Sequence, residues 1–148
     1  VLGLVSITPG AGFVPLWAAF IIGGLVSPIC YFAVSVIKAK FGYDDALDAF
    51  GCHGVGGIWG GIATGLFAKS SINPVAQWDG LVFGDYHLFV AQVLSIAVTI
   101  AIAIVGTLVC AGIVKLIVPL RVDEHAERIG MDEAMHGERA YPTFTGLD

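Results

Sequence analysis

One histidine stands in an apolar stretch of this chain and is the residue best suited to chemistry there. The stretch from Asp44 to Ala68 reads DDALDAFGCHGVGGIWGGIATGLFA, with His53 near its middle. A neutral imidazole donates and accepts hydrogen bonds, so it can bind a small polar molecule or pass a proton without burying a permanent charge. A structural histidine whose hydrogen bonds are satisfied is the alternative interpretation.

The surroundings of the histidine on a helix indicate what it could bind. Residues three or four apart on a helix lie one above the other. The face that carries His53 is therefore predicted to carry Phe50, Gly57, Gly60 and Thr64. A face with one aromatic ring, one imidazole and few other side chains can line a narrow passage. Apolar walls disfavour a bare cation, so the passage suits a small neutral or weakly basic solute.

A series of glycines marks the same stretch. Glycines at helical spacing let helix backbones approach closely in lipid. We expect one stripe of Gly54, Gly57, Gly61 and Gly65, with Gly56 and Gly60 beside it, and packing as the role of the set.

The acids precede the helix. Acids in a first helical turn satisfy free N–H groups and the positive end of the helix dipole, so Asp44, Asp45 and Asp48 either cap this helix or have a special role.

The composition is that of a membrane protein. Apolar residues make up 57% of the 148 residues and charged residues only 13%, against about 25% charged in soluble domains. A membrane-spanning helix needs roughly 20 apolar residues. The sequence predicts an all-α polytopic fold with a transmembrane region over 1–120 and a tail over 121–148. Its helices are expected at about 14–38, 45–68 and 86–119.

Basic residues predict the orientation of these helices. Lys38 and Lys40 lie between the first two helices, and Lys115 and Arg121 end the third. With three spans, all of these ends lie on one side, and Lys69 lies on the other. The positive-inside rule makes the first side cytoplasmic, so the tail is expected in the cytoplasm.

Several classes of function are disfavoured. The net charge is −5 and no basic patch is present, which argues against nucleic-acid binding. Three cysteines without CxxC spacing predict neither a metal site nor a disulfide. No nucleophile stands with a base and an orienting acid, and GVGG within a helix is not a dinucleotide loop. We therefore expect that the protein is not an enzyme and that it holds no metal and no cofactor.

The apolar stretch and its flanks resemble one family. DDALDAFGCHGVGGIWGGIATGLFA resembles the helix that carries the second pore histidine of the ammonium transporter family (Amt/MEP/Rh). VSITPGAGFVPLWAAFIIGG resembles the loop and helix before it, and LRVDEHAERIGMDEAMHGERAY resembles the bacterial-type cytoplasmic tail. The resemblance covers essentially the whole chain. Pro28, and Met131 where leucine is usual, depart from common members.

The resemblance implies a fold and a function. The family has eleven transmembrane helices, of which this chain would be the last three, and forms homotrimers in the cell membrane. Each subunit has a narrow apolar pore for ammonium and ammonia, with two hydrogen-bonded histidines. His53 would be one of them, and its partner would come from upstream helices of the same protein. Phe50 would lie near the pore, and Asp45 and Asp48 would cap the helix and anchor the tail or loops.

Alternatives remain open at the level of the sequence. Some family members sense ammonium, so a receptor of the same fold is one alternative. The chain starts without methionine, so a truncated fragment that does not conduct by itself is another. The acidic tail is either a solvated, partly disordered end or an ordered surface that a PII-type signalling protein could bind.

Overall fold

Every regular element that the structure describes is a helix. The structure, a computed structural model, describes residues 1–138. These residues form two compact units, one over Val1–Ala101 and one that begins at Ile102. The all-α prediction is confirmed for the described part of the chain.

The first long helix is built from three consecutive segments. These are α2 (Leu16–Phe32), the π-helical η2 (Ala33–Lys38) and α3 (Ala39–Phe41). Together they form one apolar helix from Leu16 to Phe41 that is long enough to cross a membrane. The helix continues through Pro28 and ends at Gly42, whose φ of 61° requires the left-handed region that glycine adopts freely.

The second helix starts later than the sequence predicts. It comprises the π-helical η3 (Phe50–Val55) and α4 (Gly56–Phe67), instead of beginning near residue 45. The reason is the backbone at Asp48, which has a φ of 53° and cannot continue a right-handed helix. The acids of this segment therefore precede the helix and act on it from outside.

The third helix is the longest. α5 runs from His87 to Lys115, 29 residues, after the short 3₁₀ helix η4 (Leu81–Phe83). At 1.5 Å per residue it is about 44 Å long, more than the ~30 Å hydrocarbon core of a bilayer. It ends before the predicted residue 119, since Pro119 has no N–H to donate to the carbonyl of Lys115, and its ring would clash with that carbonyl in a continued helix.

Two of the three helices meet a length-and-hydropathy criterion for crossing a membrane within residues 1–138. These are Leu16–Phe41 and His87–Lys115. The helix between them contains the glycines and His53, which lower its hydropathy. Its passage through the membrane stays a prediction.

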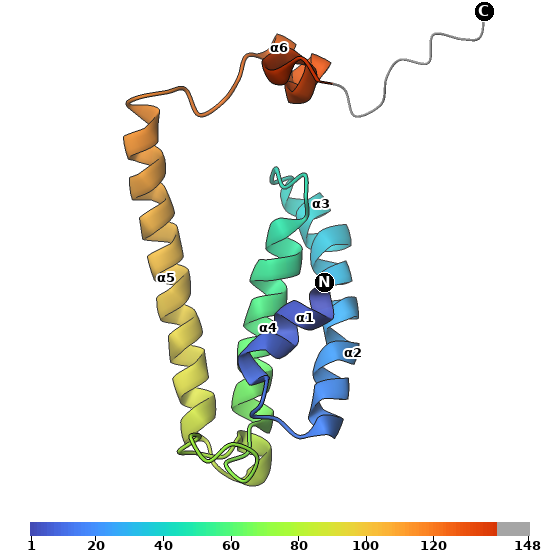
Figure 1. Cartoon of the computed structure of the whole chain (residues 1–148), viewed down its shortest axis with the longest axis vertical. Coiled ribbons are helices and arrows are strands. Elements are labelled where there is room, and N and C mark those ends of the chain that lie inside the picture. Colours follow the sequence, from blue (N-terminus) through green and yellow to red (C-terminus); the bar gives the residue numbers. More distant parts are fainter. Residues whose placement is uncertain (139–148) are drawn as a thin grey trace, which may run out of the picture. The chain divides into compact units, whose positions relative to one another are not determined.

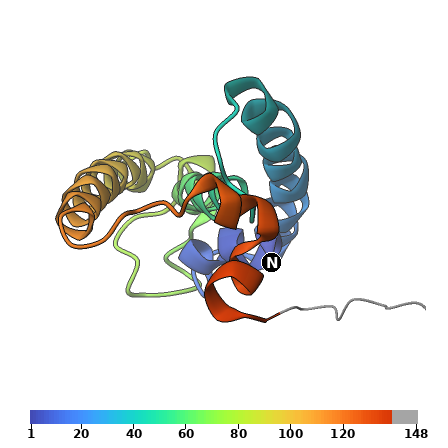
Figure 2. The same cartoon turned by 90° about the horizontal axis from the view of Figure 1, so that it is seen from above.

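A short helix that the sequence did not predict completes the first unit. α1 (Leu2–Ile7), continued by the 3₁₀ helix η1 (Thr8–Gly10), packs against both α2 and α4. Figure 1 shows α1 crossing these two helices, and Figure 2 shows the three together from above. Six residues are too few to show a helical period, so hydrophobic patterning could not reveal α1.

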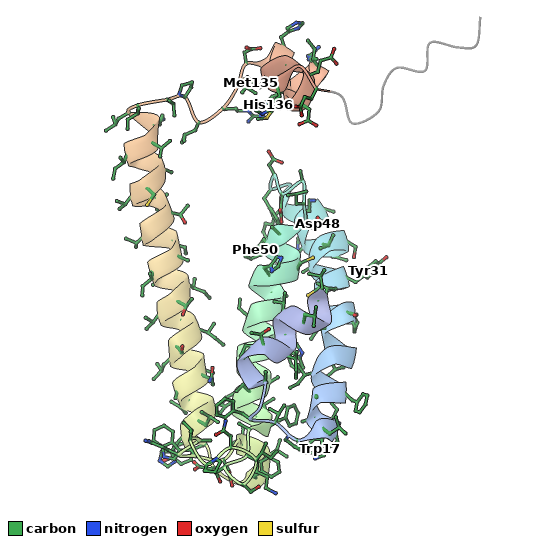
Figure 3. The ribbon with its side chains drawn as sticks, in the orientation of Figure 1. Trp17, Tyr31, Asp48, Phe50, Met135 and His136 are labelled. Atoms are coloured by element: carbon green, nitrogen blue, oxygen red, sulfur yellow. The ribbon has the colours of Figure 1, made fainter. Side chains whose placement is uncertain are left out.

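One face of the first long helix forms the core of this unit. Its buried residues recur every three or four positions: Ala18, Ile22, Val26, Cys30 and Ala33. The other faces are exposed, and Tyr31, 73% exposed, points away from the helices in Figure 3. An apolar helix with one buried face suits a surface that meets lipid or further helices.

The second unit contains two short helical segments after α5. α6 (Glu124–Ile129) is capped by Asp123, whose carboxylate accepts the N–H of Ala126 at 2.9 Å. The π-helical η5 (Asp132–His136) follows Gly130. The predicted tail of 121–148 thus has helical structure in its first part, and residues 139–148 lie outside the described residues.

Candidate functional site

His53 lies within η3, on a side of the helix that this chain leaves exposed. Phe50, three residues earlier, is 54% exposed. Figure 3 shows Asp48 and Phe50 close together where this helix begins. The site is therefore the first turns of the helix, with an aromatic ring and an imidazole on accessible faces.

Other sides of the same helix are packed by segments of the first unit, and glycine makes this possible. A Cβ at Gly60 would overlap the backbone oxygen of Ser6 in α1. A Cβ at Gly51 would lie 2.5 Å from Cγ2 of Val34 in η2. On a further side, a Cβ at Gly65 would lie 2.9 Å from the Cα of Phe89 in α5. Gly65 belongs to the stripe that the sequence predicts, and Gly60 lies beside it. Together these glycines allow three neighbours, α1, η2 and α5, to pack closely on the helix.

The exposed side near the histidine extends to Gly57. A Cβ at Gly57 would meet nothing within 4 Å, whereas Gly60 is buried. Thr64 is also buried, 5% exposed, and its hydroxyl donates to the carbonyl of Gly60 at 2.8 Å. The predicted common face of these residues therefore splits after Gly57. The cause is α1 with η1, which the sequence did not predict: Gly60 packs against Ser6, and Thr64 lies against Gly10.

The ring of Phe50 is held from two directions. Tyr43 contacts it edge-on, with ring centroids 5.8 Å apart and an interplanar angle of 86°. On its own helix the ring covers Gly54, where a Cβ would lie 2.9 Å from Cδ2 of Phe50. The position of Phe50 therefore depends on the loop before the helix as well as on the helix.

Two acids and one lysine fix the start of this helix. The carboxylate of Asp45 accepts the backbone N–H groups of Ala49 and Phe50, both at 2.9 Å. The amine of Lys38 donates to the carbonyl of Asp45 at 2.5 Å and to the carboxylate of Asp48 at 2.6 Å. Asp45 and Asp48 thus act on free N–H groups and on a cation from the preceding helix.

Sequence reasoning missed three residues that hold this helix in place: Lys38, Ser6 and Trp59. The Ser6 hydroxyl donates to the carbonyl of Gly56 at 3.0 Å, and the indole N–H of Trp59 donates to the carbonyl of Ile22 at 3.1 Å. A part-buried indole needs an acceptor, which is the signal at Trp59. At Lys38 the signal is a cation near the end of one helix, followed within ten residues by the three acids Asp44, Asp45 and Asp48.

The loop after α4 carries its own polar contacts. A hydrogen bond from the backbone N–H of Ser70 lowers the pKa of Asp79 below its usual value. The backbone N–H of His87 does the same for the pKa of Asp85, helped by the His87 ring at 2.6 Å. Lys69 stands over the ring of Phe83, 5.0 Å from its centroid. These contacts lie at the opposite end of α4 from Asp48.

In residues 1–138, no three His, Cys, Asp or Glu side chains gather into a group that could hold a metal ion. The three cysteines are free. Cys30 is buried, Cys52 is partly buried and Cys110 is exposed on α5.

The fold and the site define a helical membrane protein with an imidazole on an uncovered helix face. Residues 1–141 match the model of the Ammonium Transporter Family. The chain therefore belongs to the ammonium transporter family, as the resemblance of the His53 helix and its flanks implies. The expectation that it is not an enzyme is confirmed by this membership.

Three proteins named as ammonium transporters or as Mep2 are similar to nearly the whole of this chain. The chain is 52% identical to the ammonium transporter of Bacillus subtilis, over 94% of this chain and 34% of that protein. It is 42% identical to the ammonium transporter Amt1 of Archaeoglobus fulgidus, with the same coverage. The crystal structure of Saccharomyces cerevisiae Mep2 matches 99% of this chain and 34% of the yeast chain, with 33% identity and a TM-score of 0.77. The chain thus spans about a third of the length of these relatives.

Proposed function

We propose that the whole protein carries ammonium or ammonia across the cell membrane and that this chain supplies one wall of the pore. The observation that carries the proposal is the exposure of His53 on a helix whose other sides are packed by α1, η2 and α5. An imidazole at membrane depth is costly against lipid and marks a pathway or a proton relay. The uncovered face therefore belongs to the inside of the protein.

The chemistry of this face suits ammonia and its proton. His53 would accept a hydrogen bond from the solute or hold its proton, because a neutral imidazole offers both functions. The ring of Phe50 and the open side at Gly57 would form apolar walls that exclude hydrated ions. A second histidine from the rest of the protein would complete the pair that the family resemblance implies. Gly60 would contribute by close packing against α1.

The assembly follows from the same proposal. The protein would form a homotrimer in the cell membrane, with each subunit carrying its own pore. Lys38, Lys40, Lys115 and Arg121 would lie on the cytoplasmic side, which places the tail in the cytoplasm.

The tail would offer a surface for a partner. Its described part exposes Ile129, Met131 and Met135 beside the charges of α6. A PII-type signalling protein could bind there. A pull-down with the cognate PII protein at low energy charge that recovers nothing would remove this part of the proposal.

A transport experiment tests the central claim. The full-length protein is reconstituted in vesicles, and ammonium-evoked current and labelled methylammonium uptake are compared between the natural protein and His53→Ala. We expect lost uptake or altered selectivity with normal trimer assembly. His87→Ala, at the exposed start of α5, is the matched control and should leave both unchanged. Unchanged uptake and selectivity in His53→Ala would make His53 a packing residue.

The sensor alternative gives a different result. A receptor of this fold would bind ammonium without sustained flux, so binding without uptake by the natural protein would favour it.

A further inference from the structure

A single lysine connects the first long helix to the start of the histidine-bearing helix. Lys38 is the last residue of η2, and its amine bridges two oxygens that belong to different residues. The carbonyl of Asp45 lies at 2.5 Å and the carboxylate of Asp48 at 2.6 Å. The side chains of Lys38 and Asp48 are 28% and 37% exposed, so the ion pair is partly shielded from solvent.

The residues that Lys38 bridges are those that start the helix. The carboxylate of Asp45 accepts the N–H groups of Ala49 and Phe50, and the carbonyl of Asp48 accepts the N–H of Cys52 at 2.9 Å. Lys38 therefore holds the first turn from outside. Phe50 and His53 are both within five residues of Asp48.

The backbone at Asp48 is strained. Asp48 is the only residue other than glycine with a positive φ in the described chain, at 53°. Such a conformation is uncommon for a residue other than glycine and persists only where its surroundings hold it, often at functional sites. The bond from Lys38 is the one described side-chain contact of the Asp48 carboxylate. The strain and the contact together indicate that the first turn of this helix is held in one defined direction.

We propose that Lys38 is a positioning residue for transport: through Asp45 and Asp48 it sets the direction in which Phe50 and His53 face the pore. This inference rests on the proposed function for its effect on transport. Its structural part, control of the helix start by Lys38, stands independently. Lys38 acts through its contacts and does not touch the solute.

The test uses Lys38→Met, which keeps an unbranched side chain of similar length and removes the amine. Lys40→Met is the matched control, because Lys40 lies two residues away and is exposed. Lys38→Arg keeps the positive charge, so this variant should differ less from the natural protein than Lys38→Met does. Lys38→Gln, a milder change, replaces Lys38→Met if that variant does not fold. All variants are made in the full-length protein.

Two measurements are made on each variant. The first is the ratio of ammonium current to methylammonium uptake, normalised to folded protein. The second is the rate at which a maleimide labels Cys52, with all other cysteines replaced. Cys52 is partly buried and lies next to His53, so its reactivity reports the position of this turn without any need for transport.

We expect Lys38→Met to change both quantities about three- to tenfold, which corresponds to the lower part of the range of coupling energies between contacting residues. Lys40→Met should change neither. The inference is overturned if Lys38→Met and Lys40→Met give the same labelling rate of Cys52 and the same ratio of current to uptake. It is also overturned if the two variants differ only in the amount of folded protein. If the labelling rate changes but His53→Ala transports normally, the positioning of the helix start stands and the proposed pore role of His53 fails.

Discussion

The α-carbon of Gly60 in α4 packs directly against the backbone carbonyl of Ser6 in α1. Backbone contact of this kind needs glycine, because any Cβ at position 60 would overlap the Ser6 oxygen. The same serine donates its hydroxyl to the carbonyl of Gly56, one turn earlier on the histidine-bearing helix. α1 and α4 are thus joined by close packing and by a buried hydrogen bond within two adjacent turns.

Substitution of Gly60 by alanine should destabilise the protein. The new methyl group meets backbone atoms that cannot move aside, and overpacking of this kind costs about 1–3 kcal/mol. Thermal unfolding of the purified full-length protein in detergent measures the effect. Gly24→Ala is the control, because a Cβ at this exposed position of α2 meets nothing within 4 Å. Equal midpoints for the two variants would contradict the described contact.

Removal of the Ser6 hydroxyl should also lower stability. Ser6 is fully buried, and Ser6→Ala leaves the carbonyl of Gly56 without this bond. We expect a loss of about 0.5–1.5 kcal/mol in the free energy of unfolding, measured with denaturant or heat. Ser35→Ala is the matched change, because the Ser35 hydroxyl donates to the backbone carbonyl of Tyr31 at 2.6 Å on an exposed surface. A larger loss at Ser35 than at Ser6 would speak against the role of α1.

The carboxylate of Asp85 should make stability depend on pH in the acid range. The backbone N–H of His87, and then its ring, hold the pKa of Asp85 below the usual value of a free aspartate. The unfolded chain therefore takes up the proton first as pH falls. The contribution of Asp85 is fully present above the ordinary pKa of about 4 and is lost as pH falls through the lowered pKa.

Asp85→Asn tests this dependence. The amide keeps an acceptor for the His87 N–H but does not titrate, so the variant should lose less stability between neutral and acid pH than the natural protein. Unfolding midpoints across this range measure the difference. Parallel curves for the two proteins would show that Asp85 does not contribute.

Loss of the Asp123 cap should weaken the short helix in the tail. The Asp123 carboxylate accepts the Ala126 N–H at the start of α6, and replacement of such a cap by alanine costs about 1 kcal/mol. Hydrogen exchange of residues 124–129 in the full-length protein should rise in Asp123→Ala and stay low in Asp123→Ser, which keeps an acceptor. Unchanged exchange in Asp123→Ala would mean that other contacts, such as the pairing of Glu127 with Arg121, suffice.

Much of the architecture could be read from local patterns in the sequence. Apolar runs located the helices of α2 and α5, since a membrane helix must be apolar along its whole length. Gly42 and Pro119, residue types that end helices, lie at or a few residues after the observed helix ends. The resemblance carried by the His53 stretch identified the family, which the match over residues 1–141 confirms. The roles of His53 and Phe50 in transport stay predictions.

Only the tertiary structure decided how the histidine-bearing helix is held. The spacing of its glycines could not tell which neighbour each one meets, because spacing gives a face of the helix but not the segment that packs on it, such as α1 at Gly60 or α5 at Gly65. The pairing of Lys38 with Asp48 depends on a turn whose geometry includes a left-handed aspartate. Contacts between Ser6 and Gly56 join segments 50 residues apart. Hydropathy records that a residue is apolar, but the partner it packs against is set by the path of the whole chain.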